Sequence, residues 1–230
     1  GSVTIPGVAG AGTNGNLGVE IGVRMVVTTL SGDVTVSGTG SGTGTGNIGV
    51  SFLTGAVVGS GGALTVDGTG GNGTSSNAGV SLTSATLNGA GAVSISGTGR
   101  GSGGNNRGIA STGGIIGSSG GAVTLAGIGS ASSTGSVNGG ISLAGGRVNA
   151  TGLLTLLGNG GTGAGNNRGI YASATAIGGG TLDIRGAAAS GTTAAGFVGR
   201  MSSSAIRSAA NFATRPRSIT NRPVMSESPT

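Results

Sequence analysis

Few side chains in this sequence could carry out acid–base, nucleophilic or metal chemistry. The 230 residues include no His and no Cys, and the only acids are Glu20, Asp33, Asp67, Asp183 and Glu227. The commonest general base and the commonest metal ligands are therefore missing. Two carboxylates could act as a pair only if distant parts of the chain brought them together. We expect no catalytic residue, no metal site, no cofactor and no enzymatic activity.

Arginine is the only basic residue, and it is unevenly distributed along the chain. Residues 1–198 hold six Arg and four acids, a net charge of +2, whereas residues 199–230 hold five Arg and one acid, a net charge of +4. Phe212 is the only aromatic residue in the second segment, which gives nucleic-acid bases little to stack on. We expect no nucleic-acid partner. No apolar run reaches the roughly 18 residues of a membrane-spanning helix, so none is predicted.

The most regular feature is the motif Asn-x-Gly-(Val/Ile), which occurs six times. Its Asn residues are Asn16, Asn47, Asn77, Asn106, Asn138 and Asn167. Asn tolerates a left-handed backbone and offers both a donor and an acceptor, so stacked Asn side chains could hydrogen-bond from one repeat to the next as a structural ladder. The alternative is that each Asn only marks an exposed turn. The Gly two residues later indicates either a positive φ or a tightly packed bend.

Two aliphatic patterns keep step with these Asn residues. An aliphatic residue follows each Asn by ten positions: Val26, Val57, Leu87, Ile116, Val148 and Ile177. An aliphatic–polar–aliphatic pattern precedes each Asn and follows the last one: Val3/Ile5, Val34/Val36, Leu64/Val66, Val93/Ile95, Val123/Leu125, Leu154/Leu156 and Leu182/Ile184. The period is about 30 residues, which is in the range of stacked repeat proteins.

Each repeat predicts three short strands separated by Gly-rich turns. Within residues 60–89, short apolar–polar alternations cover residues 64–66, 80–82 and 85–87. One repeat cannot bury its aliphatic residues alone, but stacking would place Leu64 between Val34 and Val93, at the spacing of about 4.8 Å between hydrogen-bonded strands. The sequence therefore predicts an all-β fold, a right-handed parallel β-helix (solenoid) with about 30 residues and three short strands per coil.

The repeats predict an array of between six and seven coils over residues 1–198. After Val198 the composition shifts to Ser, Arg and Pro. We expect residues 199–230 to be a disordered tail or a partly helical cap; sequence unrelated to the repeat is a third alternative. The face of such a helical cap would carry Phe197, Met201, Ala205, Ala209 and Phe212. Because Val3 already belongs to a repeat, we expect further coils in a longer parent chain.

Three other patterns suggest ligands. Arg107 and Arg168 occupy equivalent corners two coils apart, where they could contact an acidic glycan or simply be solvated. An outward file of Thr residues could order water as ice-binding surfaces do, although only one polar position separates the two inward aliphatics of each strand. Strings such as Gly97-Thr98-Gly99 resemble phosphate-binding loops, but chance is the better explanation because they lack Lys and a following helix.

One string of residues resembles a known group of proteins. Val34-Thr35-Val36-Ser37-Gly38-Thr39-Gly40, followed by Asn47-Ile48-Gly49-Val50, is similar to the repeats of very large secreted bacterial β-strand-repeat proteins. Those proteins resemble filamentous-haemagglutinin-type exoproteins and autotransporter passenger domains. The resemblance covers residues 1–198. It implies export across a Gram-negative envelope, a β-helical stalk at the cell surface and an adhesive or spacer role.

We therefore expect a non-enzymatic structural stalk or adhesive segment of a secreted or cell-surface bacterial protein. Its expected location is extracellular or associated with the outer membrane of a Gram-negative bacterium. Its partners would be host or environmental glycans or surface proteins, besides further coils of its parent chain. The alternatives are a β-helical glycan-binding or carbohydrate-active module and, with less support, an ice-binding protein.

Overall fold

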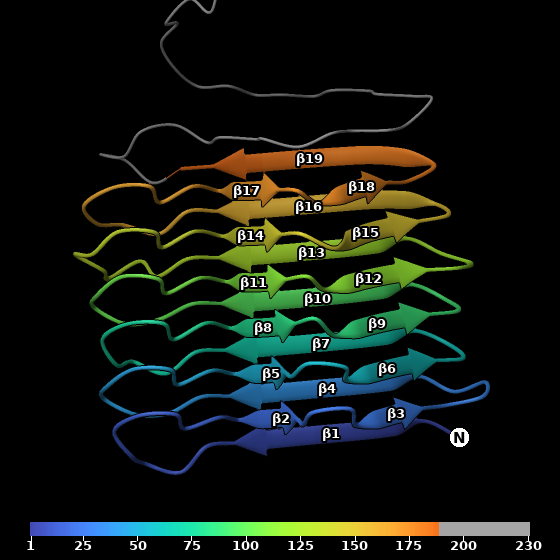
Figure 1. Cartoon of the computed structure of the whole chain (residues 1–230), viewed down its shortest axis with the longest axis horizontal. Coiled ribbons are helices and arrows are strands. Elements are labelled where there is room, and N and C mark those ends of the chain that lie inside the picture. Colours follow the sequence, from blue (N-terminus) through green and yellow to red (C-terminus); the bar gives the residue numbers. More distant parts are fainter. Residues whose placement is uncertain (189–230) are drawn as a thin grey trace, which may run out of the picture.

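The computed structural model describes residues 1–188, which form a solenoid of parallel β-strands without a helix. Each coil takes about 30 residues and contributes three strands. The coils wind in a right-handed sense, and each strand lies beside its equivalent in the next coil (Figure 1). The predicted fold class is confirmed.

One side of the solenoid is a seven-stranded sheet, which we call sheet A. Its strands are β1 (Val3–Val8), β4 (Val34–Thr39), β7 (Leu64–Thr69), β10 (Val93–Thr98), β13 (Val123–Ile128), β16 (Leu153–Asn159) and β19 (Thr181–Ala187). Leu64 pairs with Val34 on one side and with Val93 on the other, and Val93 pairs with Val123. The predicted aliphatic column is therefore continuous.

Two six-stranded sheets of shorter strands form the other side. Sheet B contains β2 (Val19–Ile21), β5 (Val50–Phe52), β8 (Val80–Thr83), β11 (Ile109–Thr112), β14 (Ile141–Ala144) and β17 (Ile170–Ser173). Sheet C contains β3 (Val26–Thr28), β6 (Val57–Ser60), β9 (Thr86–Gly89), β12 (Ile115–Ser118), β15 (Arg147–Ala150) and β18 (Ala176–Gly178). The chain runs from sheet A to B to C in every coil.

The core lies between sheet A and the other two sheets and is almost entirely aliphatic. In the third coil, Leu64, Val66, Val80 and Leu87 are fully buried, and their equivalents in neighbouring coils stack on them. Each fully buried side chain of this kind stabilises the fold by roughly 1.5–3 kcal/mol. Stacked columns of aliphatics therefore hold the solenoid together along its whole described length.

The predicted closing aliphatics were wrong in the first two coils. Val26 is 62% exposed, and the column that contains Leu87 continues through Val58 and Val27 instead. From Phe52 to Val57 the chain takes five steps, whereas their partners Leu82 and Thr86 are four steps apart. The one extra residue in this turn moves the inward-facing position one residue along the strand.

Glycine lets sheet A approach the beginning of sheet B closely. A Cβ atom on Gly79 would meet the backbone nitrogen of Thr98 and would lie 2.7 Å from the carbonyl oxygen of Gly68. In return, a Cβ on Gly68 would lie 2.6 Å from the carbonyl carbon of Gly79. None of the six motif glycines has a positive φ, so the tightly packed bend is the correct explanation. The same contact, repeated at Gly97, accounts for the Gly-Thr-Gly strings.

The last strand, β19, begins a seventh coil at the end of the described residues. The predicted limit of the array at residue 198 lies outside them. So do the tail over 199–230 and the proposed helical cap with Phe197, Met201, Ala205, Ala209 and Phe212.

Replacing Gly79 by Ala should lower the free energy of unfolding by at least about 2 kcal/mol, because the new methyl group meets backbone atoms on two sides. Chemical denaturation of the purified protein measures the change. Gly165→Ala is the matched control, since nothing lies within 4 Å of its added Cβ. The control should change stability by less than about 0.5 kcal/mol. Equal effects of the two substitutions would show that the close approach at Gly79 is not limiting.

Candidate functional site

The six motif Asn residues form a continuous ladder at the bend between sheets A and B. The backbone N–H of each of the first five Asn residues donates to the side-chain Oδ1 of the Asn in the next coil. The N···O distances are 3.0 Å for Asn16 to Asn47, 2.9 Å for Asn47 to Asn77, 3.0 Å for Asn77 to Asn106, 2.9 Å for Asn106 to Asn138 and 2.7 Å for Asn138 to Asn167. The ladder therefore connects all six coils that contain the motif.

Burial distinguishes this ladder from a row of surface turns. All its members except Asn16 are fully buried, and Asn16 is partly exposed in the first coil. The Nδ2 groups of the first five ladder Asn residues donate to nearby oxygens, as when Asn106 donates to the carbonyls of Thr74 at 2.8 Å and Gly103 at 3.0 Å. The Nδ2 group of Asn167 is buried and has no partner within residues 1–188. Buried amides need such partners because an unpaired polar group is costly. The predicted coil-to-coil ladder is confirmed, and the exposed-turn alternative is wrong.

The left-handed backbone at this bend belongs to the residue before each ladder Asn, not to the Asn itself. These residues have φ between 54° and 70°, and they are Gly15, Gly46, Ser76, Asn105, Val137 and Asn166. The conformation costs an L-residue roughly 1–2 kcal/mol, and Gly, Asn and Asp adopt it most readily. A β-branched residue such as Val137 is the least suited of the six.

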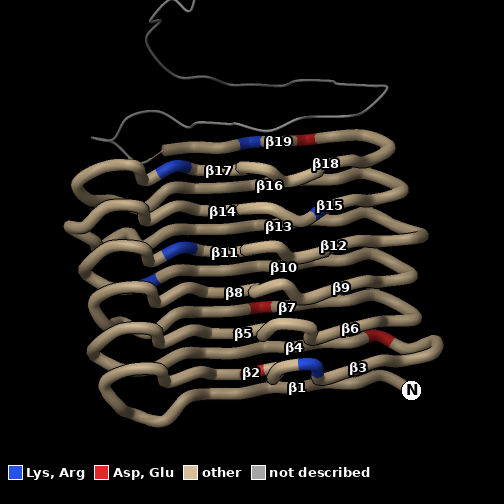
Figure 2. Tube along the Cα trace, viewed as in Figure 1, with Lys and Arg blue, Asp and Glu red and all other residues tan. Residues whose placement is uncertain are grey.

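Charged side chains are sparse on the solenoid (Figure 2). One ion pair occurs within residues 1–188, between Arg185 and Asp183 of β19 at 2.8 Å. Arg107 and Arg168 precede β11 and β17, and each donates through Nη2 to an Asn side chain two residues earlier. The distances are 3.0 Å from Arg107 to Asn105 and 3.1 Å from Arg168 to Asn166.

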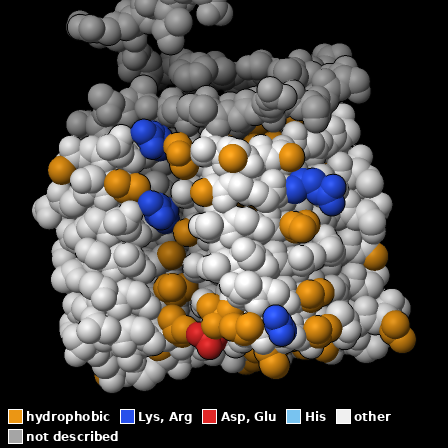
Figure 3. Space-filling view, in the orientation of Figure 1, with side chains coloured by type: hydrophobic (Ala, Val, Ile, Leu, Met, Phe, Trp, Pro, Cys, Tyr) orange, Lys and Arg blue, Asp and Glu red, His pale blue; other side chains and the backbone are white. Residues whose placement is uncertain are grey.

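Arg107 and Arg168 line one surface pocket of about 240 Å³. The coil between them has Gly139 at the equivalent position, so no side chain at this corner separates the two arginines. The rest of the lining is uncharged: Val137, Ile141, Ser142, Asn166 and Tyr171. Basic side chains separated by uncharged surface are visible on this face of the molecule (Figure 3). The structure thus brings together the two arginines that the sequence placed at equivalent corners.

The surroundings of the two arginines differ from those of freely solvated residues. The guanidinium carbon of Arg168 lies 5.0 Å from the centre of the Tyr171 ring, a cation–π geometry. Burial lowers the pKa of Arg107 from its ordinary value, because desolvation disfavours the charged form. An arginine nevertheless stays protonated at neutral pH. The pocket therefore holds a partly desolvated positive charge.

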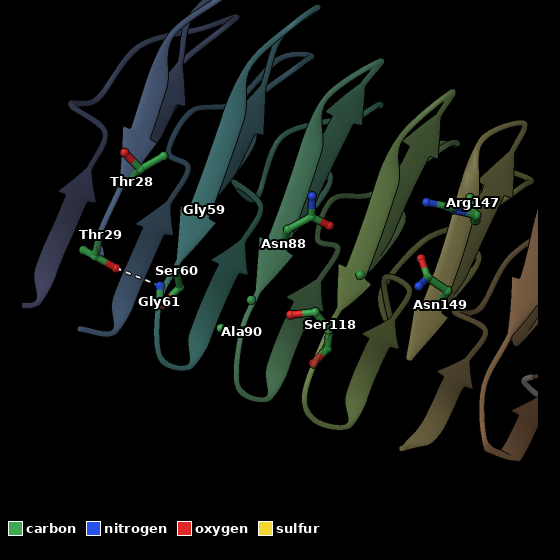
Figure 4. Close-up of a pocket in the computed structure, with 13 residues that line it drawn as sticks. Thr28, Thr29, Gly59, Ser60, Gly61, Asn88, Ala90, Ser118, Arg147 and Asn149 are labelled. Atoms are coloured by element: carbon green, nitrogen blue, oxygen red, sulfur yellow. Dashed lines mark hydrogen bonds between the residues drawn. The ribbon is translucent and has the colours of Figure 1, made fainter. Parts of the chain in front are cut away.

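A second hollow, of about 500 Å³, lies over the outward face of sheet C (Figure 4). The outward position of this sheet alternates between a polar side chain and Gly in successive coils: Thr28, Gly59, Asn88, Gly117, Asn149 and Gly178. The Oδ1 atoms of Asn88 and Asn149 lie 2.9 and 3.1 Å from the place of a Cβ on Gly117, so this Gly makes room for both amides. An alignment of the repeats would have revealed this alternation at the outward position of the third strand of each coil.

The predicted Thr file lies on the outward face of sheet A. Its members pair in register from coil to coil: Thr4, Thr35, Thr65, Ser94, Thr124 and Thr155. The strands of sheet A are longer than predicted, so each has at least three outward positions rather than one. The adjacent outward column is chemically mixed and consists of Pro6, Ser37, Asp67, Ser96, Ala126, Leu157 and Arg185. Two neighbouring Thr files therefore do not form.

The acids of the described residues do not assemble into a metal-ligand cluster. Glu20 lies on β2, Asp33 immediately before β4, Asp67 on β7 and Asp183 on β19. Within residues 1–188, no group of three His, Cys, Asp or Glu side chains could hold a metal ion. That part of the chain also has no helix of the length and apolar character required to cross a membrane.

Replacing Asn77 by Ala should lower the free energy of unfolding by about 2–3 kcal/mol. The substitution leaves the buried N–H of Asn47 without its acceptor and removes the bond to Asn106. Asn88→Ala is a matched control, because Asn88 is exposed on sheet C and its change should stay within about 0.5 kcal/mol. Denaturation curves that shift equally for both variants would contradict a stabilising ladder.

Replacing Val137 by Asn should raise the free energy of unfolding by about 1 kcal/mol, because Asn adopts the left-handed backbone more readily. The reciprocal substitution Asn105→Val should lower it by a similar amount. Thermal unfolding followed by circular dichroism measures both variants. A destabilised Val137→Asn protein would mean that packing of the Val side chain outweighs its backbone strain.

Comparisons with known proteins add no family to these observations. No protein-family model, no curated protein and no solved structure matches this chain significantly.

Proposed function

We propose that this chain is a non-enzymatic structural stalk or adhesive segment of a secreted or cell-surface bacterial protein. The observation that carries the proposal is the buried Asn ladder, which runs beside unbroken aliphatic columns through successive coils. Backbone hydrogen bonds join each coil to the next in three sheets. A body connected in this way resists bending, so it can hold other modules at a distance or present a repeated surface.

The composition supports a role without catalysis. The whole sequence lacks His and Cys and has only five acidic residues. The paired carboxylates of a glycoside hydrolase would have to lie within about 10 Å of each other across the scissile bond. The four acids in residues 1–188 lie on separate strands or turns, and Asp183 is already paired with Arg185.

The proposed location rests on the resemblance to secreted β-strand-repeat proteins. Val34–Gly40 and Asn47–Val50 carry that resemblance, and the lack of Cys agrees with export through an oxidising compartment. Within this proposal, host or environmental glycans and surface proteins are the expected partners, together with further coils of the parent chain.

A glycan-binding module is the second candidate function, and one observation favours it. The pocket between Arg107 and Arg168 combines two cations with hydroxyl and amide groups. Such a combination is suited to a polar ligand that carries negative charge. This function is compatible with a stalk, because a long repeated surface can also bind.

Antibodies raised against the solenoid should label intact cells of the bacterium that produces the protein, because the proposed stalk lies outside the cell. Protease added to the intact cells should remove the label. A cytoplasmic protein of the same cells, probed in parallel, serves as the control for leakage. Labelling that requires permeabilised cells would contradict the proposed location and, with it, the stalk.

A further inference from the structure

One corner of the solenoid changes its chemistry along the stack. The residue after each ladder Asn occupies this corner, and the successive residues are Leu17, Ile48, Ala78, Arg107, Gly139 and Arg168. The first three are apolar, whereas the last three place Gly between two arginines. Because coils are spaced by about 4.8 Å, the Cα atoms of Arg107 and Arg168 are about 10 Å apart. Both side chains can therefore reach one group that sits over Gly139.

The two arginines are held in place before any ligand arrives. Asn105 and Asn166 each accept one hydrogen bond from the neighbouring guanidinium, and the Tyr171 ring lies against Arg168. A guanidinium has five N–H donors, so most remain free for a ligand. Side chains that are already ordered lose less conformational entropy on binding.

The charge of the pocket is not balanced by the residues that line it. No acidic residue lines the pocket, and the one ion pair within residues 1–188 is formed by Arg185 and Asp183 on another strand. Partial burial of Arg107 weakens its interaction with water, which strengthens its attraction to an anion. The pocket is therefore suited to a negatively charged group.

We infer that this pocket binds the carboxylate of an acidic sugar unit in a glycan. A planar carboxylate matches the forked geometry of Arg in two parallel hydrogen bonds. Ser142, Tyr171 and Asn166 supply hydroxyl and amide groups for sugar hydroxyls, and the partly exposed Val137 supplies apolar surface for the ring. The volume of about 240 Å³ is several times the roughly 30 Å³ share of one water molecule, so it admits more than a bare anion.

An acidic peptide fits this pocket less well. Peptides commonly bind by adding a strand to a free sheet edge. Here β14, between β11 and β17, is paired on both sides, so its backbone offers no free edge beside the pocket. The inference deepens the glycan-binding candidate and rests on it, while the stalk role does not depend on it.

Isothermal titration calorimetry of the full chain tests this inference. The probes are trimers of galacturonate, glucuronate and mannuronate, with their methyl esters as neutral controls. We expect at least one uronate trimer to bind and its ester to bind at least about tenfold more weakly, because esterification removes the charge-assisted hydrogen bonds. Arg107→Gln and Arg168→Gln should each weaken binding at least about tenfold, and Arg168→Lys should also weaken it because Lys cannot bind in a fork.

Arg100→Gln is the matched control variant, because Arg100 is exposed in the same coil as Arg107, lies outside the pocket and carries the same charge. It should change the affinity by less than about twofold. Circular dichroism of all variants should show the strand content of the parent chain, so that a loss of affinity is not a loss of fold.

Four results would overturn the inference. These are no binding of any uronate, equal loss with Arg100→Gln, equally tight binding of inorganic sulfate, and equally tight binding of poly-glutamate that depends on the same arginines. Neutral glycans bound equally well by the parent chain and the arginine variants would overturn the pocket assignment but keep the glycan-binding candidate. If the chain binds no glycan at all, both the pocket assignment and the glycan-binding candidate are wrong. The stalk role is then still tested separately, by labelling of intact cells.

Discussion

Backbone hydrogen bonding between successive coils fixes equivalent residues about 4.8 Å apart, so that nearly every side chain has its counterparts directly above and below. This arrangement stabilises aliphatic residues, because each aliphatic side chain is covered by its equivalents in the coils above and below. Asn gains as well, because its amide can accept from one coil while its own backbone donates to the next. Like charges at equivalent positions of neighbouring coils would destabilise the stack, since like charges that face each other across strands repel.

The unusual composition, in which charged residues make up 7% of the chain, agrees with this last point. In the described strand pairings, no charged residue faces another charged residue in the neighbouring coil. Asp67 lies between Ser37 and Ser96, and Arg147 lies between Ile115 and Ala176. The corner with Arg107, Gly139 and Arg168 follows the same rule, because Gly separates the two cations.

The periodic features of the fold were predictable from the sequence, because burial and register act on every coil alike. The aliphatic columns and the Asn ladder depend only on residue type and spacing. The closing aliphatics of the first two coils were not predictable from spacing, because one extra residue after Phe52 changes which residue faces inward. The length of sheet A was also missed, since Gly38 and Gly68 look like turn residues but lie within strands.

The candidate site was only partly predictable for a related reason. Register alone places Arg107 and Arg168 at the same corner. The pocket between them also needs the missing side chain of Gly139 and the ring of Tyr171, which comes from the following strand. Likewise, the left-handed residue before each Asn has no single identity, because Gly, Ser, Asn and Val all occupy it. Backbone geometry imposed by stacking overrides the preferences of these side chains.

The Asn ladder has a consequence for how such a gene can change. Its bonds join residues 29 to 32 positions apart, so the loops of each coil vary in length while the bond itself stays the same. Unequal recombination that removes or duplicates the segment between two ladder codons would bring together two ends that already match. The length of the protein could then evolve in whole coils, each step changing the reach of the molecule by one strand spacing.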